Sequence, residues 1–215
     1  HVYRNETRKG INANFFSAMS RAKGDFIAIS DQDDIWELDK IENQMNSIQD
    51  NWLSSGFSKP FADNESIYFD NRIPNLNLER LIYIASSTPG HTLLFRKELL
   101  SKVPMMDFIL YDHLMTITAA ALGKLSFCNK ILVNHREHSS SATFTLPVMK
   151  RGKSTKNIKN IISSLLRTFI LYLKLHSKIR SYFIDMCCLL NEFPNQDCNV
   201  YAKKIAYYNS QKGLF

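Results

Sequence analysis

An acidic heptapeptide directly after a short apolar run constrains the fold more than any other feature of the sequence. The run "DFIAIS" has the length and composition of a buried strand, and "SDQDDIW" places Asp31, Asp33 and Asp34 directly after it. Apolar residues at helical spacing precede the run, in "INANFFSAMSRA", and follow it, in "ELDKIENQMNSIQDNW". We therefore predict an α/β fold with ligand-binding carboxylates at the carboxyl end of this strand.

The rest of the first 150 residues alternates between strand and helix character. "HTLLF" (91–95), "LSFC" and "ILVNHR" are typical of short strands, whereas 111–123 has helical spacing and ends at Gly123. Residues 54–74 are polar and allow no assignment. The helix predicted over 37–52 should turn four apolar residues towards the core: Leu38, Ile41, Met45 and Ile48.

A change in composition divides the chain near residue 147. Residues 1–150 carry 16 basic and 17 acidic residues, a net charge of −1, whereas 151–215 carry 11 and 3, a net charge of +8. Apolar residues from Ile158 to Leu173 keep helical spacing, with basic residues between them. We therefore predict an α/β domain over 1–146 and a basic, amphipathic helical extension over 147–215.

Charge and motif content narrow the range of partners. No apolar stretch reaches the roughly 18 residues of a membrane-spanning helix, and the N-terminus lacks the features of a signal peptide. We therefore expect a cytoplasmic protein, whose basic extension suits peripheral contact with an anionic membrane at its inner face. Zinc-binding, helix-turn-helix and RNA-binding patterns are missing from the sequence, so nucleic acid is not an expected partner.

The acidic turn is suited to a divalent cation. Two carboxylates one residue apart repel each other unless a cation compensates them, and oxygen ligands favour Mg²⁺ or Mn²⁺. One alternative is a solvated acidic turn that caps the next helix. Another is a phosphatase of the haloacid dehalogenase type, with Asp31 as nucleophile and Asp33 as acid, although Ile35 stands where that family prefers Thr or Val.

Four motifs in register resemble the family 2 glycosyltransferases, particularly the bacterial rhamnosyltransferase-like members. They are "NETRKG" leading to "DQDDIW", then "GHTLLFRKELL", "YDHLMTITAAALGKL" and "VNHREHSSS", and together they extend from about Asn5 to Ser141. The resemblance implies a GT-A fold, related to the Rossmann fold, with a mixed sheet flanked by helices. It also implies inverting transfer of a sugar from a nucleotide-diphosphate donor to a saccharide or lipid-linked saccharide, in bacterial surface polysaccharide synthesis.

The resemblance also assigns roles to individual residues. It implies Asp33 as a direct metal ligand, Asp31 as a residue shared between the metal and the donor's ribose, and Asp34 as support for the donor-binding turn. It implies Asp112, at the start of a helix, as the base that takes the proton from the acceptor hydroxyl. The same Asp112 could instead serve only as a helix N-cap.

Three further polar residues have weaker assignments. His138, in "HREHSSS", matches an element in which some family members have another metal ligand, and imidazole suits that role. His91 is expected to shape the donor or acceptor pocket, and Asn14 to touch the donor.

The sequence departs from the family pattern at its N-terminus. Family members open with a strand and a turn of the "PTYN" kind, then a second strand ending in "DDGS", and together these hold the nucleotide base. Neither motif occurs here. We therefore expect the chain by itself to be incomplete as a catalytic domain and not to transfer sugar, and a non-catalytic binding module is the alternative.

Overall fold

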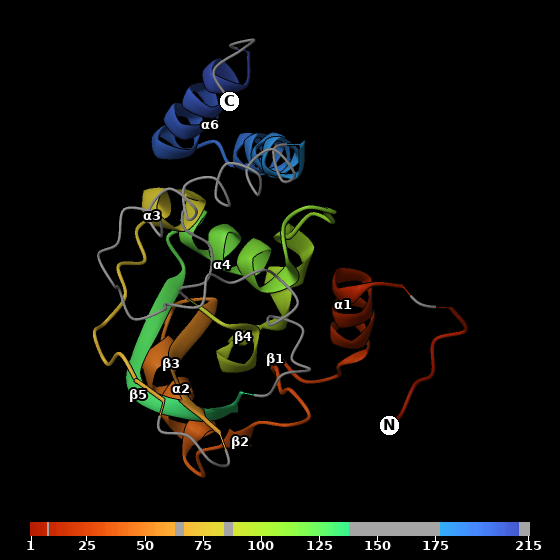
Figure 1. Cartoon of the computed structure of the whole chain (residues 1–215), viewed down its shortest axis with the longest axis vertical. Helices are drawn as coiled ribbons and strands as arrows, with labels where there is room; N and C mark the ends of the chain where they lie inside the picture. Colours follow the sequence, from red (N-terminus) through yellow and green to blue (C-terminus); the bar gives the residue numbers. More distant parts are fainter. Residues whose placement is uncertain (8, 63–66, 84–87, 138–176, 211–215) are drawn as a thin grey trace, which may run out of the picture.

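Five strands form one mixed sheet in the computed structural model, which describes residues 1–7, 9–62, 67–83, 88–137 and 177–210 (Figure 1). The strand order is β1-β4-β3-β5-β2. Only the β3–β5 pair is parallel, and the other neighbours are antiparallel. The strands are β1 (Phe26–Ala28), β2 (Ile35–Trp36), β3 (Leu53–Phe61), β4 (Leu94–Arg96) and β5 (Leu125–Arg136).

Helices cover the sheet, and one of them lies at the centre of the core. The helices are α1 (Ile11–Arg21), α2 (Lys40–Ile48), α3 (Leu78–Tyr83), α4 (Tyr111–Ala121), α6 (Gln196–Ser210) and the 3-10 turns η1 (Gly90–Thr92) and η2 (Lys97–Lys102). Residues 177–191 are also helical. In Figure 1, α4 lies between the sheet and the C-terminal helices. Among the described helices, none combines the length and the apolar character needed to cross a membrane.

The core explains why α4 takes this central place. Leu114 and Ile117 of α4 have no solvent exposure and belong to one apolar cluster with Phe95 of β4 and with Met186 and Leu190 of the C-terminal helix. The described C-terminal residues therefore share a core with the α/β part. The predicted boundary at 147 and the apolar stripe from 158 to 173 lie outside the described residues, so both stay predictions.

The strand β3 occupies the middle of the sheet, in a stretch for which the sequence allowed no assignment. It pairs along its length with β5, and with β4 only at Leu53 and Ser54. Pro60 is tolerated because only β5 pairs with β3 at that point. A side chain at Gly56 would collide with Leu132 of β5, so a glycine is required there. The sequence did not predict this central strand because the stretch that forms it is largely polar.

The buried face of α2 differs from the prediction, although the helix itself is present. Leu38 precedes the helix and is fully exposed, Ile41 and Met45 are exposed, and only Ile48 of the four predicted residues is buried. Lys40 and Gln44 are buried instead. Gln44 is buried because its side chain donates hydrogen bonds to the backbone carbonyls of Ser54 and Thr92.

Candidate functional site

The acidic loop, residues 29–34, connects β1 and β2, the two opposite edge strands of the sheet, and Asp34 fixes the end of this loop. The Asp34 side chain is fully buried. Its Oδ1 accepts hydrogen bonds from the Arg136 backbone amide at 3.0 Å and from Nδ1 of His135 at 2.9 Å. These contacts follow from the register of β2 and β5, in which Ile35 lies opposite Asn134. Asp34 thereby anchors the loop to the end of β5.

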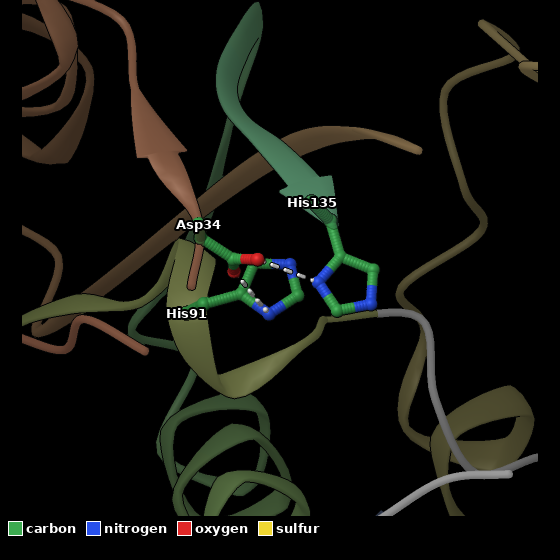
Figure 2. Close-up of side chains that lie close together, drawn as sticks. All are labelled: Asp34, His91 and His135. Atoms are coloured by element: carbon green, nitrogen blue, oxygen red, sulfur yellow. Dashed lines mark hydrogen bonds and ion pairs between the residues drawn. The ribbon is translucent and has the colours of Figure 1, made fainter. Parts of the chain in front are cut away.

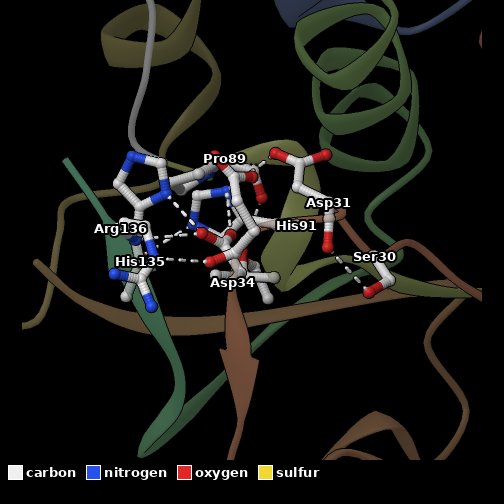
Figure 3. A network of polar contacts seen from close by, with 11 residues as sticks. Ser30, Asp31, Asp34, Pro89, His91, His135 and Arg136 are labelled. Atoms are coloured by element: carbon white, nitrogen blue, oxygen red, sulfur yellow. Dashed lines mark hydrogen bonds and ion pairs between the residues drawn. The ribbon is translucent and has the colours of Figure 1, made fainter. Parts of the chain in front are cut away.

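A second histidine, from η1, faces the same carboxylate. Figure 2 shows His91 and His135 next to Asp34, and the two rings stack on each other with 4.7 Å between their centres. Nδ1 of His91 lies 3.4 Å from Oδ2 of Asp34 and 3.6 Å from Oδ2 of Asp31, as the network in Figure 3 shows. Nε2 of His91 is 2.7 Å from the Ser58 hydroxyl of β3. Four segments that are distant in sequence therefore meet at this point: the acidic loop, β3, η1 and β5.

The second oxygen of Asp34 is suited to a cation. Oδ2 is buried, and no group in the described part of the chain forms a hydrogen bond with it. A buried carboxylate oxygen in that state is costly unless a positive charge compensates it. Two ligand atoms that each lie about 2.1 Å from the same metal ion are roughly 3.0 to 3.4 Å from each other. Nδ1 of His91 lies 3.4 Å from the Asp34 oxygen and 3.6 Å from the Asp31 oxygen, which is close to this range. Asp34, His91 and His135 form a group that could hold a metal ion.

The structure brings together some of the predicted residues. Asp31, Asp34 and His91 converge, and His135, which the sequence did not single out, joins them. Only the β2–β5 register could have revealed His135. The backbone carbonyl of Asp33 accepts a hydrogen bond from the Arg136 guanidinium. Its role as a metal ligand stays a prediction.

Two other predicted residues lie apart from this group or beyond the described chain. Asn14 is exposed on α1 and accepts a hydrogen bond from the Asn5 side chain, so the structure adds no support to its predicted contact with the donor. His138 lies outside the described residues, and its role stays a prediction.

Asp112 approaches this group from the start of α4. Its carboxylate accepts hydrogen bonds from the backbone amides of His113 and Gly90, and the charge of His91 acts on it. Burial raises the pKa of Asp112 above its ordinary value, and these contacts oppose the rise only in part.

The packing of η1 against the start of α4 requires a glycine at position 90, because a side chain at Gly90 would collide with the Tyr111 hydroxyl. The N-cap of α4 is Leu110. Asp112 therefore does not occupy the capping position.

A match to a family model identifies the family of this chain. Residues 1–108 match the model of glycosyl transferase family 2. The chain belongs to this glycosyltransferase family. No curated protein matches the sequence.

Solved structures share the architecture of this family 2 member. S. aureus TarS (residues 1–349) in complex with UDP-GlcNAc matches with a TM-score of 0.50 and 16% identity, over 97% of this chain and 72% of that one. S. aureus TarS in complex with UDP gives a TM-score of 0.49 and 13% identity, over 91% and 49%. The first match shows the GT-A-like fold predicted from the sequence, a mixed five-stranded sheet flanked by helices.

Proposed function

We propose that this family 2 glycosyltransferase moves a sugar from a nucleotide-diphosphate donor to a hydroxyl acceptor, with inversion at the anomeric carbon. The observation that carries the proposal is the arrangement around Gly90 and His91. Asp31 and Asp34 face His91 from the acidic loop, and Asp112 contacts Gly90 from α4. Inverting transfer needs a site for the leaving diphosphate and a base for the acceptor, and this arrangement offers both.

Asp112 is the proposed base. Its carboxylate would take the proton of the acceptor hydroxyl as that oxygen attacks the anomeric carbon. A carboxylate with a raised pKa is a stronger base than an exposed one, so its burial suits this task. The hydrogen bonds from His113 and Gly90 orient the carboxylate.

Asp34 and His91, together with Asp31 from the same loop, would hold a divalent ion, because Nδ1 of His135 already contacts Oδ1 of Asp34. The predicted ligand Asp33 directly precedes Asp34, and His138 follows three residues after His135. When bound, Mg²⁺ or Mn²⁺ would stabilise the negative charge that develops on the leaving diphosphate. Oδ2 of Asp34 is buried and accepts no hydrogen bond from the described residues, which supports this proposal. His135 would act by holding the other oxygen of Asp34.

The nucleotide sugars bound by relatives give the first probes for a direct test. TarS binds UDP-GlcNAc and UDP. The full-length protein should be assayed with Mn²⁺ and with UDP-GlcNAc, dTDP-rhamnose and other nucleotide sugars, and release of nucleoside diphosphate should be measured. We expect one donor to be turned over in the presence of metal. Hydrolysis of a phosphomonoester through a phosphorylated Asp31 would favour the phosphatase alternative, and binding without turnover would favour a binding module.

The C-terminal region supports a proposal about location. We propose that the enzyme works at the cytoplasmic face of the membrane on a saccharide or lipid-linked acceptor for surface polysaccharide. Exposed apolar side chains lie in this basic region, at Ile179, Ile184, Val200, Tyr207 and Tyr208. Each Lys or Arg near anionic lipid contributes about 1 kcal/mol to membrane binding. Flotation with anionic liposomes should show binding that weakens with salt, and equal binding to neutral liposomes would contradict the proposal.

A further inference from the structure

The C-terminal helix over 177–191 forms directional contacts with the first turn of α4. The Tyr182 hydroxyl oxygen lies 2.9 Å from Nε2 of His113 and 3.0 Å from the backbone carbonyl of Ile82 in α3. His113 directly follows Asp112, the proposed base. The contact therefore joins a residue 70 positions further along the chain than Asp112 to the turn that carries this carboxylate.

The contact between Tyr182 and His113 lies in a buried part of the fold. His113 is 8% exposed, and burial lowers its pKa to about 4, so the imidazole is neutral near pH 7. The Tyr182 hydroxyl donates its one hydrogen to the Ile82 carbonyl, and the hydroxyl oxygen lies 2.9 Å from Nε2 of His113. Without that hydroxyl, the Ile82 carbonyl and the ring nitrogen would both lose a hydrogen-bond partner.

A second polar side chain on the same helix fixes the loop that enters α4. Oδ2 of Asp185 accepts a hydrogen bond from the Phe108 backbone amide at 3.1 Å. Tyr182 and Asp185 are three residues apart, so they lie on the same face of the helix. Together they hold the chain on both sides of Leu110, where α4 begins.

Apolar packing alone does not account for these contacts. Met186, Leu189 and Leu190 are fully buried and would attach the helix to the core without any hydrogen bond. Apolar contacts tolerate small shifts, whereas hydrogen bonds require a defined distance and direction. The polar pair therefore adds positional accuracy at the one turn of α4 that carries Asp112.

We propose that Tyr182 and Asp185 are positioning residues for Asp112, and that the C-terminal helix is part of the catalytic unit. The inference rests on the proposed role of Asp112 as the base. In transfer reactions, a misplacement of about 1 Å can lower the rate by a factor of about 100. A helix far along the chain from Asp112 thereby controls the alignment between base and acceptor.

The test compares single-atom changes in the full-length protein. Tyr182→Phe removes one hydroxyl and keeps the ring, and Asp185→Asn keeps the size of the side chain. Tyr68→Phe, at an exposed tyrosine between β3 and α3, is the matched control. The carboxyl titration of Asp112 is followed by carbon-13 NMR, with Asp112→Asn to assign the signal. Steady-state kinetics are measured below each melting temperature, with the donor found in the assay above.

The two changes should affect turnover more than donor binding. We expect Tyr182→Phe to lower kcat by about tenfold or more with a donor KM within about twofold of the parent. The Asp112 titration should move towards the ordinary range as water reaches the turn, and the Tyr68→Phe control should match the parent in both measurements.

A lower melting temperature with unchanged kcat and an unchanged Asp112 titration would overturn the proposal, because the helix would then act only in stability. Turnover that survives Asp112→Asn would instead contradict the proposed base. The NMR titration still decides in that case whether Tyr182 positions the turn.

Discussion

Asn12 of α1 caps helix α4, which begins 99 residues later in the chain. Its Oδ1 accepts a hydrogen bond from the Tyr111 backbone amide at 2.8 Å, and its Nδ2 donates to the carbonyls of Met106 and Ile109, both at 2.8 Å. Leu110, at the N-cap position of α4, has an apolar side chain that cannot cap the helix. One side chain from another helix therefore supplies the missing cap next to Asp112.

Asn12→Ala should destabilise the protein. The change removes three hydrogen bonds and leaves buried or half-buried backbone groups without partners, so the free energy of unfolding should fall by about 1 to 3 kcal/mol. Urea denaturation measures the difference. Asn14→Ala is the matched control on the same helix, because Asn14 is exposed, and its effect should stay within about 0.5 kcal/mol. Equal losses in the two variants would contradict a capping role for Asn12.

The sequence predicted those parts of the fold and site that depend on local pattern. A short apolar run followed by carboxylates predicted β1 and the acidic loop, and the helical spacing after Tyr111 predicted α4 with Asp112 in its first turn. Both signals lie within a few residues of the feature that they predict. The motif order of the family extended this to the GT-A-like fold.

Features that depend on contacts between distant segments could not be predicted in this way. The contact of His135 with Asp34 requires the register of β2 on β5, which brings residues 101 positions apart together. From the sequence alone, Gln44 is expected at the surface. Its burial is explained by the backbone carbonyls of Ser54 and Thr92, which accept hydrogen bonds from its side chain. Tertiary hydrogen bonds reversed a prediction that hydrophobic spacing alone would favour.

Asp112→Asn should separate catalysis from donor binding. The amide keeps the size of the side chain but cannot act as a base, so kcat should fall by about a hundredfold or more while donor affinity persists. Steady-state kinetics and nucleotide-sugar titration measure the two effects. Turnover close to that of the parent would place the base elsewhere.

The pH dependence of the parent follows from the raised pKa of Asp112. The base must be deprotonated, so kcat/KM should fall as the pH decreases through this raised pKa. In the same range the folded protein binds the proton more tightly than the unfolded chain, so this carboxyl adds stability as the pH falls. The loss of activity should therefore precede unfolding, which circular dichroism at each pH checks. Simultaneous loss of both would contradict the assignment.

Asp34→Asn should weaken metal binding and keep the loop in place. The amide oxygen can still accept the hydrogen bond from the Arg136 amide, whereas the charge beside His91 is lost. We expect the affinity for Mn²⁺ to fall by about tenfold or more. Calorimetric titration with Mn²⁺ alone measures this on the chain itself.

Two further variants complete the metal test. Asp39→Asn removes one negative charge at an exposed position nearby and should leave Mn²⁺ affinity within about twofold. Asp33→Asn tests the ligand implied by family resemblance. If the Mn²⁺ affinity falls in Asp33→Asn but not in Asp34→Asn, the metal does not bind beside His91.

Lys40 should make the stability of the protein depend on alkaline pH. The side chain is fully buried, its Nζ lies 3.7 Å from the centre of the Trp36 ring, and burial lowers its pKa from 10.5 to about 8. Between these values the unfolded chain binds a proton that the folded protein has lost, so the contribution of Lys40 to stability rises with pH from about 8 to about 10.5.

Lys40→Met keeps an unbranched chain over Trp36 and removes the titrating group. The variant should be more stable than the parent at pH 7, and its excess stability should shrink as the pH approaches 10. Urea denaturation at several pH values measures both curves, with Lys203→Met, at an exposed position of α6, as control. A constant difference between Lys40→Met and the parent across this range would show that the ammonium keeps its proton in the folded protein, held by the face of the Trp36 ring.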